Sequence, residues 1–236
     1  MIVAAGATAA LAAKAATRII PIVFNTGGDP VALGLVASLN RPGANVTGSA
    51  NLAAELAPKQ LQLLRELIPG AAPLVGVLAD PAFPDIQSNI ADLQAAARTL
   101  GLQLIVVNAR TDSDLETAFA TFSQHHIGAV IVAISSFYNR RMEQLAALAA
   151  RHALPAIYPY REFAIAGGLI SYGSSLGYVA QQSGIYTGRI LRDDKPADLP
   201  VQQVTKLDLV INLKTAKALG LTIPETLLAT ADEVIQ

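Results

Sequence analysis

Cysteine is absent from this 236-residue sequence, and histidine occurs only three times. The absence of cysteine excludes a disulfide framework, a thiolate metal site and a cysteine nucleophile. Charged residues make up only 15% of the chain and the formal net charge is -1. With charges of both signs scattered along the chain, no basic face indicates nucleic acid and no acidic tail indicates a basic partner. Hydrophobic residues make up 52%, enough for a large core, but no apolar run is long enough to span a bilayer.

The sequence also lacks the motifs that carry chemistry or bind nucleotides. "GGDPVALG" does not supply the glycine pattern of a dinucleotide-binding turn, and "GATAALAAK" is not a phosphate-binding P-loop. Gly173-Ser174 is not a nucleophile elbow. None of the histidines has metal-ligand spacing, and His125 and His126 end a predicted helix, where a cation suits the helix terminus; the alternative is a role in proton transfer. We therefore expect no metal site, no cofactor and no enzymatic activity.

Strand and helix patterns alternate along most of the chain. Apolar runs such as "MIVAA", "RIIPIVF", "PLVGVLA" and "AVIVAI" are typical of buried parallel strands, and amphipathic stretches follow them. The predicted helices are 8–17, 30–39, 54–67 ended by Pro69-Gly70, 85–100 stopped by Gly101, 111–124 opened by "TDSD", 139–151 and 179–192. This alternation predicts an α/β fold with parallel sheets flanked by helices.

The number of strand–helix units favours two sheets over one. Two candidate seams carry Gly, Ser, Thr and Asn directly after strands, at Asn45 to Ser49 and at Tyr172 to Leu176. If the chain crosses between lobes there, residues 49–171 form an inserted second lobe. Residues 1–48 and 172–236 then form a discontinuous first lobe.

Polar and aromatic side chains cluster where the predicted strands end, and open α/β sheets bind ligands at the carboxyl ends of their strands. Asp29 has two interpretations, as a residue that caps a helix or as a residue that faces the cleft. A ligand carboxylate could bind hydroxyl and N–H groups at helix starts, a ligand ammonium group could pair with Asp29 or Glu162, and two tyrosines could flank an apolar side chain. The candidate ligand-binding residues are Thr8, Asn25, Thr26, Asp29, Ser135, Phe137, Tyr138, Tyr160, Glu162 and Tyr172.

Several long phrases together resemble one family. "KAATRIIPIVFNTGGDPVALGLVASLNRPGANVTGSA", "LLRELIPGA", "GLISYGSSLGYVAQQSGIYTGRIL" and "KPADLPVQQVTKLDLVINLKTAKALGLTIP" are similar to ABC-transporter substrate-binding proteins, the family that includes the tryptophan-binding lipoproteins. The resemblance covers nearly the whole chain. It implies a two-lobed type I periplasmic-binding-protein fold that closes on a small solute, such as an aromatic amino acid. Thr8, Thr26 and Asp29 would then belong to the first lobe's ligand wall, and Phe137, Tyr138, Tyr160 and Glu162 to the second's.

The resemblance further implies an ABC permease of the inner membrane as partner and a periplasmic location. No signal peptide is recognisable at Met1, so a chain that truly starts there would be cytoplasmic. Family members carry about two more strand–helix units before the strand at Ile2 to Ala5. We therefore expect an incomplete first lobe whose exposed strand edge could pair with a second copy. The alternative functions are a cytoplasmic ligand-sensing regulator of the same fold and a Rossmann-like enzyme.

Overall fold

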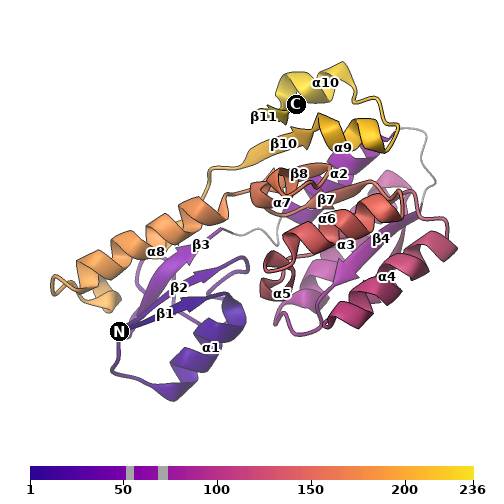
Figure 1. Cartoon of the computed structure of the whole chain (residues 1–236). Helices are drawn as coiled ribbons and strands as arrows, with labels where there is room; N and C mark the ends of the chain where they lie inside the picture. Colours follow the sequence, from indigo (N-terminus) through magenta and orange to yellow (C-terminus); the bar gives the residue numbers. More distant parts are fainter. Residues whose placement is uncertain (52–55, 69–73) are drawn as a thin grey trace.

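A computed structural model of the chain describes residues 1–51, 56–68 and 74–236, and the strands within these residues form two sheets (Figure 1). The smaller sheet has the order β1-β2-β3-β9, with every neighbouring pair parallel. We call this sheet and the helices on its faces the first lobe. Its strands are β1 (Ile2–Ala5), β2 (Ile22–Thr26), β3 (Val46–Ala50) and β9 (Gln202–Gln203).

The larger sheet has the order β11-β10-β8-β7-β6-β4-β5 and, with its helices, forms the second lobe. Its pairs are parallel except for β10, which runs antiparallel to β8. Its central strands show no alternation of polar and apolar residues, because helices cover both faces of the sheet. The strands are β4 (Leu74–Ala79), β5 (Gln103–Asn108), β6 (Ala129–Val132), β7 (Ala156–Tyr158), β8 (Ile170–Gly173), β10 (Asp208–Asn212) and β11 (Glu233–Ile235).

The first lobe is a three-layer unit with one long helix on each face of its sheet. Helix α1 (Ala7–Ala16) shares a hydrophobic cluster with Ile22 and Phe24 of β2. Helix α8 (Leu176–Ile190) instead packs through Tyr186 on Val23, whose side chain points to the opposite face. The short 3-10 helix η2 (Pro196–Asp198) lies beside β3.

The second lobe has a separate cluster on each face of its sheet. One contains Phe119, Phe122 and Leu145, and the other contains Leu61 and Leu93. The helices are α2 (Ala57–Leu67), α3 (Ile86–Leu100), α4 (Asp112–Gln124), α5 (Ser136–Asn139), α6 (Met142–Arg151), α7 (Arg161–Ile165), α9 (Leu213–Ala218) and α10 (Glu225–Thr230).

Two helix boundaries confirm the sequence signals that predicted them. Helix α4 begins with a capping box, in which the Thr111 side chain accepts from the Asp114 N–H and the Asp114 carboxylate accepts from the Thr111 N–H. Helix α3 ends at Gly101, as expected from a glycine C-cap. The predicted start at Ala54 and the predicted stop at Pro69-Gly70 lie outside the described residues.

The helix predicted over residues 30–39 is wrong, because this segment forms successive turns. Asp29 and Pro30 do start a turn, and the Leu33 N–H donates to the Asp29 carbonyl over 2.9 Å. Gly34 then adopts φ +66°, a left-handed conformation that ends helical hydrogen bonding. The helix predicted over 139–151 is also different. Arg141, with φ -130°, separates α5 from α6, which begins only at Met142.

The chain passes between the lobes three times: between β3 and α2, between β8 and α8, and between β9 and β10. The seams expected at Asn45 to Ser49 and at Tyr172 to Leu176 lie near the first two crossings, and no seam was expected at the third. The assignment of residues 172–236 to the first lobe is therefore wrong for the end of β8, for β10 and for β11, which pair in the larger sheet. Helix α8 packs on the smaller sheet and β9 pairs within it, so both belong to the first lobe.

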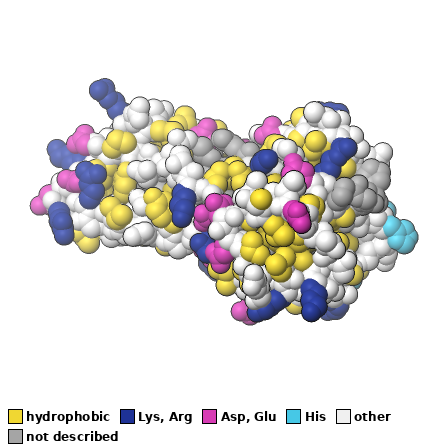
Figure 2. All heavy atoms as spheres, turned by 90° about the horizontal axis from the view of Figure 1, so that it is seen from above, with side chains coloured by type: hydrophobic (Ala, Val, Ile, Leu, Met, Phe, Trp, Pro, Cys, Tyr) yellow, Lys and Arg dark blue, Asp and Glu magenta, His cyan; other side chains and the backbone are white. Residues whose placement is uncertain are grey.

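Charged side chains of both signs are scattered over both lobes on the face that Figure 2 shows. No helix among the described residues combines the length and apolar character needed to cross a membrane.

Candidate functional site

A cavity of about 230 Å³, which we call the inner cavity, lies between the two lobes. The segments around it follow the carboxyl ends of strands in both sheets, where parallel α/β sheets place their ligands. The first lobe supplies residues at or after the ends of β1, β2 and β3 and at the start of α8, and the second lobe supplies residues after β4, β6 and β7. Its lining residues include Ala5 to Ala7, Asn25 to Gly27, Asn51, Phe83, Ile134 to Ser136, Asn139, Arg140, Tyr160, Leu176 and Val179.

The first-lobe wall is built around the start of α1. Gly6 precedes this helix with φ 91° and ψ 154°, a conformation that is essentially restricted to glycine. No side chain caps the helix start. The N–H groups at the beginning of a helix lack intrahelical partners and attract negative charge. The wall can therefore bind an anion without a charged side chain.

Asn25 and Thr26 complete this wall at the end of β2. The Asn25 Oδ1 atom accepts a hydrogen bond from the Gly6 N–H over 3.2 Å, which fixes the turn before α1. Thr26 is buried, and its hydroxyl accepts from the Gly28 N–H over 3.1 Å. Turns follow Thr26 instead of the predicted helix, so β2 is not followed by a second helix start in this wall. Helix α8 also begins at the cavity, but the Ser175 and Glu162 side chains cap its start.

The second-lobe wall is one helical turn, α5, with Ser135 as its N-cap. The Ser135 Oγ atom accepts from the Phe137 N–H over 2.9 Å and donates to the Asp80 carboxylate over 2.5 Å. This pair ties the turn after β6 to the loop after β4. Ser136, Asn139 and Arg140 lie on the cavity side of the turn. Among the described residues, the buried Asn139 Oδ1 atom has no hydrogen-bond partner.

Tyr160 and Asn51 join the walls at the back of the cavity. The Asn51 side-chain amide donates to the Tyr160 hydroxyl over 3.3 Å and to the Ser174 Oγ atom over 3.1 Å. Burial raises the pKa of Tyr160 to about 12, so its hydroxyl stays protonated at neutral pH. Asn51 lies at the first crossing between the lobes and Ser174 at the second, and this network therefore connects two crossings to the cavity.

A second, outer cavity of about 480 Å³ adjoins the inner one and shares Ala7, Phe83, Ser135, Ser136 and Arg140 with it. The Thr8 hydroxyl lies here, 3.5 Å from the Ala82 carbonyl of the other lobe. Phe137 lines this cavity too, with the Arg141 guanidinium 3.8 Å from its ring centroid. The outer cavity thus extends the cleft over the start of α1.

The lobes approach one another closely around both cavities. A Cβ atom added to Gly6 would lie 2.5 Å from Ser136 Oγ, and one added to Gly27 would lie 2.0 Å from Ile134 Cδ1. Both distances are too short for real contacts, so glycine is needed at each position for the lobes to meet. The structure therefore has its two lobes closed over the inner cavity.

Six of the ten predicted residues line one of these two cavities: Thr8, Asn25, Thr26, Ser135, Phe137 and Tyr160. Asp29, Tyr138, Glu162 and Tyr172 line neither. Tyr138 lies in the core and its hydroxyl donates to the Ala109 carbonyl over 2.9 Å. Tyr172 packs against the core of the second lobe.

Asp29 bonds within the turn that stands where the helix was predicted. Its Oδ1 atom accepts from the Val31 N–H over 2.8 Å. Its charge also acts on Asp85: burial raises the Asp85 pKa most, and the nearby Asp29 carboxylate raises it further.

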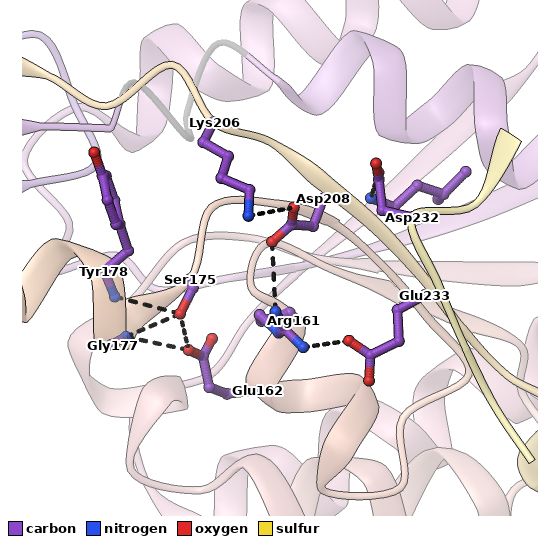
Figure 3. Close-up of polar contacts among 10 residues, drawn as sticks. Arg161, Glu162, Ser175, Gly177, Tyr178, Lys206, Asp208, Asp232 and Glu233 are labelled. Atoms are coloured by element: carbon purple, nitrogen blue, oxygen red, sulfur yellow. Dashed lines mark hydrogen bonds and ion pairs between the residues drawn. The ribbon is translucent and has the colours of Figure 1, made fainter.

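Glu162 caps a helix of the other lobe (Figure 3). Its Oε1 atom accepts from the Ser175 hydroxyl over 2.8 Å and from the Gly177 N–H over 3.2 Å, at the start of α8. The neighbouring Arg161 pairs with Asp208 over 3.6 Å and with Glu233. These contacts hold α7 to the second and third crossings, so Glu162 has a hinge position instead of the predicted cleft position.

The site prediction missed Asn139 and Arg140, which line the cavity. Helical spacing could have indicated both residues, because residues at i, i+3 and i+4 lie on one face of a helical turn. Ser136, Asn139 and Arg140 have this spacing, whereas Tyr138 points to another face. Asn51 carried no such signal, since its position depends on how the chain crosses between lobes.

The described residues contain no cluster of three or more histidine, cysteine, aspartate or glutamate side chains suited to a metal ion. What the cavity offers is a helix start, hydroxyl and amide groups, one guanidinium group and apolar side chains. This arrangement can bind a small molecule that has a polar end and an apolar end.

Two lobes of helix-flanked parallel sheets, joined by three crossings and closed over a cavity, define a type I periplasmic-binding-protein fold. The family model for ABC transporter substrate binding proteins matches residues 1–235. The chain belongs to this family.

Named relatives and solved structures are similar to nearly the whole of this chain. A tyrosine-binding protein of Clostridioides difficile strain R20291 is 27% identical over 224 residues, covering 94% of this chain and 63% of the relative. A conserved domain protein of Vibrio cholerae is 28% identical with a TM-score of 0.88, covering 99% of this chain and 78% of that one. The ABC domain of a Streptococcus pneumonia protein in complex with L-Trp is 25% identical with a TM-score of 0.87, covering 100% and 80%. The chain thus spans less than two thirds of the curated relative's length.

Proposed function

We propose that this chain binds an α-amino acid with an apolar side chain between its two lobes, as the solute-binding component of an ABC importer. The observation that carries the proposal is the composition of the inner cavity, which joins an uncapped helix start and a guanidinium group to an apolar wall. Phe83, Ile134 and Leu176 belong to this wall. An amino acid has the matching groups, a carboxylate and an ammonium group on one carbon and a side chain on the other side.

The carboxylate fits the start of α1 facing Arg140. The N–H groups of Ala7 and Thr8 lie in the first turn of the helix, where they have no intrahelical acceptor. Arg140 lines the same cavity, and no ion pair to it exists among the described residues. A guanidinium group and free N–H groups together form charge-assisted hydrogen bonds to a carboxylate.

The ammonium group fits the second-lobe turn. The Asn139 Oδ1 atom is buried and has no partner among the described residues, and a buried acceptor without a partner is costly. A ligand N–H donor would satisfy it. Asp29 and Glu162, the carboxylates first considered for this role, line neither cavity. The proposal therefore assigns the ammonium group to a neutral amide oxygen.

Two relatives support the class of ligand. One is called a tyrosine-binding protein and another was solved in complex with L-Trp. The aromatic amino acids are therefore the first ligands to test here. In the importer role, the closed form with bound solute would be recognised by an ABC permease, and the protein would act outside the cytoplasmic membrane.

A screen of the twenty amino acids, with sugars and divalent cations for comparison, tests this function. A ligand at 100 times its Kd should stabilise the fold by about 2.7 kcal/mol, visible as a raised melting temperature and then as heat in calorimetry. We expect hits among amino acids with apolar side chains and no chemical change in the recovered ligand. Binding of sugars or metal ions alone would contradict the proposal, and turnover of a hit would favour an enzyme.

We also propose that the 236-residue chain self-associates through β1. This strand is at the edge of the smaller sheet, and its Val3 side chain is 54% exposed. An uncovered strand edge with apolar side chains invites pairing with another chain. Light scattering should give a mass that rises with concentration for the native chain and less for Val3→Lys. A concentration-independent monomer would contradict this proposal and leave amino-acid binding untouched.

A further inference from the structure

The outer cavity differs in charge from the inner cavity that it adjoins. Three guanidinium groups line it, those of Arg110, Arg140 and Arg141. They come from the segment after β5 and from the turn after α5, and the start of α1 faces them with Ala7 and Thr8. The inner cavity shares only Arg140 with this set. The positive charge of the cleft is therefore concentrated in its outer part.

Carboxylates near the outer cavity neutralise this charge only in part. Asp80 lines the cavity, but its Oδ1 atom accepts from the Ala82 N–H over 2.9 Å and its Oδ2 atom accepts from the Ser135 hydroxyl. Asp112 pairs with Arg141 over 2.5 Å, and Asp114 accepts from the backbone N–H of Arg110. Within the described part of the chain, the guanidinium groups of Arg110 and Arg140 form no ion pair.

Arg141 has a fixed position that shapes the cavity. Its guanidinium lies 3.8 Å from the Phe137 ring centroid, and its Nη1 atom donates to the Phe137 carbonyl over 3.3 Å. A stacked and paired guanidinium loses little freedom when another group approaches it. Arg141 thus forms a preorganised wall, while Arg110 and Arg140 keep donors for a ligand.

We propose that the outer cavity is an anion subsite that binds a second acidic group of the ligand, a carboxylate or a phosphate, beyond the α-carboxylate. This inference rests on the proposed amino-acid site, because the apolar body of the ligand occupies the inner cavity. Arg140, at the junction of the cavities, serves the α-carboxylate. Arg110, which lines only the outer cavity, serves the second acidic group. Guanidinium groups recognise carboxylates and phosphates through paired N–H donors.

Matched pairs of probes that differ in one acidic group test the subsite by calorimetry. L-Aspartyl-L-phenylalanine and L-asparaginyl-L-phenylalanine differ only in a carboxylate, and O-phospho-L-tyrosine and L-tyrosine differ in a phosphate. We expect the acidic member of at least one pair to bind about 10-fold more tightly, since a charge-assisted contact is worth a factor of this size. The pair that responds identifies the acidic group. Arg110→Gln should abolish the difference, and Arg98→Gln, on exposed α3, should preserve it.

A second measurement makes the subsite testable without the amino-acid site. Inorganic phosphate alone should raise the melting temperature of the native chain more than chloride at equal ionic strength, and Arg110→Gln should remove this excess. Equal affinities within both pairs, or a difference that survives Arg110→Gln, overturn the subsite, while binding of L-tyrosine would still support the proposed function. A phosphate effect that depends on Arg110, with no binding of any amino acid or dipeptide, supports the subsite and contradicts the proposed function.

Discussion

The two lobes contribute different chemistry to the same cleft. In the described residues, the first lobe lines the two cavities with backbone groups, small side chains, amides and the apolar side chains of Leu176 and Val179, and with no charged side chain. The second lobe contributes Asp80 and three arginines, together with the aromatic rings of Phe83, Phe137 and Tyr160. Backbone groups at a helix start are fixed by the fold, whereas side chains can change without changing the fold. The first lobe therefore supplies a general anion-binding wall, and the second lobe supplies the charged and aromatic side chains that discriminate between ligands.

Filling the apolar part of the second-lobe wall should have the largest effect. Ile134 is buried, lines the inner cavity and lies against Gly27 of the other lobe. We expect Ile134→Trp to occupy the ligand's space and weaken amino-acid binding more than about 100-fold, or about 3 kcal/mol, in calorimetry. The matched control is Ile185→Trp on the exposed side of α8. Unchanged affinity of a folded Ile134→Trp protein would mean that the ligand binds elsewhere.

A change in the first-lobe wall should act on the fold and on closure together. Gly6→Ala places a Cβ atom in a backbone conformation that costs about 1–3 kcal/mol and brings it against Ser136 of the second lobe. We expect urea denaturation to show a loss of this size and calorimetry to show weaker binding. Gly184→Ala in α8, where a Cβ atom would meet open space, should instead stabilise the protein by up to about 1 kcal/mol. A Gly6→Ala protein of native stability and affinity would contradict the closed contact.

Two tyrosines of the second lobe have different surroundings, because Tyr138 lies in the core and Tyr160 lines the cleft. Tyr138→Phe removes a buried hydrogen bond to Ala109 and should cost about 1 kcal/mol of unfolding free energy with no change in affinity. Tyr160→Phe should lower the affinity as well, because Tyr160 lines the inner cavity and accepts from Asn51. Urea denaturation and calorimetry on both variants measure the two effects. If Tyr138→Phe weakened binding more than Tyr160→Phe, the assignment of Tyr138 to the core and Tyr160 to the ligand site would be contradicted.

The smallest expected effect concerns Asp29. Burial and the Asp29 charge raise the Asp85 pKa above its usual 3.8, so the folded protein binds a proton more readily than the unfolded chain. This contribution to stability is present at low pH and is lost as the pH rises through the folded pKa. We expect Asp29→Asn to lower the Asp85 pKa in an NMR titration and to leave ligand affinity unchanged. A large loss of ligand affinity would mean that Asp29 contacts the ligand.

The sequence predicted the α/β class because buried parallel strands appear as short apolar runs between amphipathic helices. It did not reveal the partners of β10 and β11, because their pairing with the larger sheet joins segments far apart in the chain. The helix expected after Asp29 failed through a local conflict: Asp29-Pro30 starts a turn, but Gly34 ends it. Local signals fix where an element starts more reliably than how far it continues.

The site was predictable to the extent that strand ends determine it. Thr26, Ser135 and Tyr160 follow or end strands and do line the inner cavity. Within each turn, however, the face of a side chain depends on helical phase. Tyr138 therefore points into the core, while Asn139 and Arg140 reach the cavity. Glu162 was misassigned because its partners, Ser175 and Gly177, belong to another crossing.

The central claim is that an amino acid binds between the lobes with its carboxylate at the start of α1 and Arg140. Calorimetry with L-tryptophan and with tryptamine, which lacks the carboxylate, on the native chain and on Arg140→Gln tests it most directly. The account predicts that the native chain binds L-tryptophan at least about 10-fold more tightly than tryptamine, and that Arg140→Gln loses most of this preference. A preference for L-tryptophan that stays the same in Arg140→Gln, or no preference in the native chain, would contradict the account.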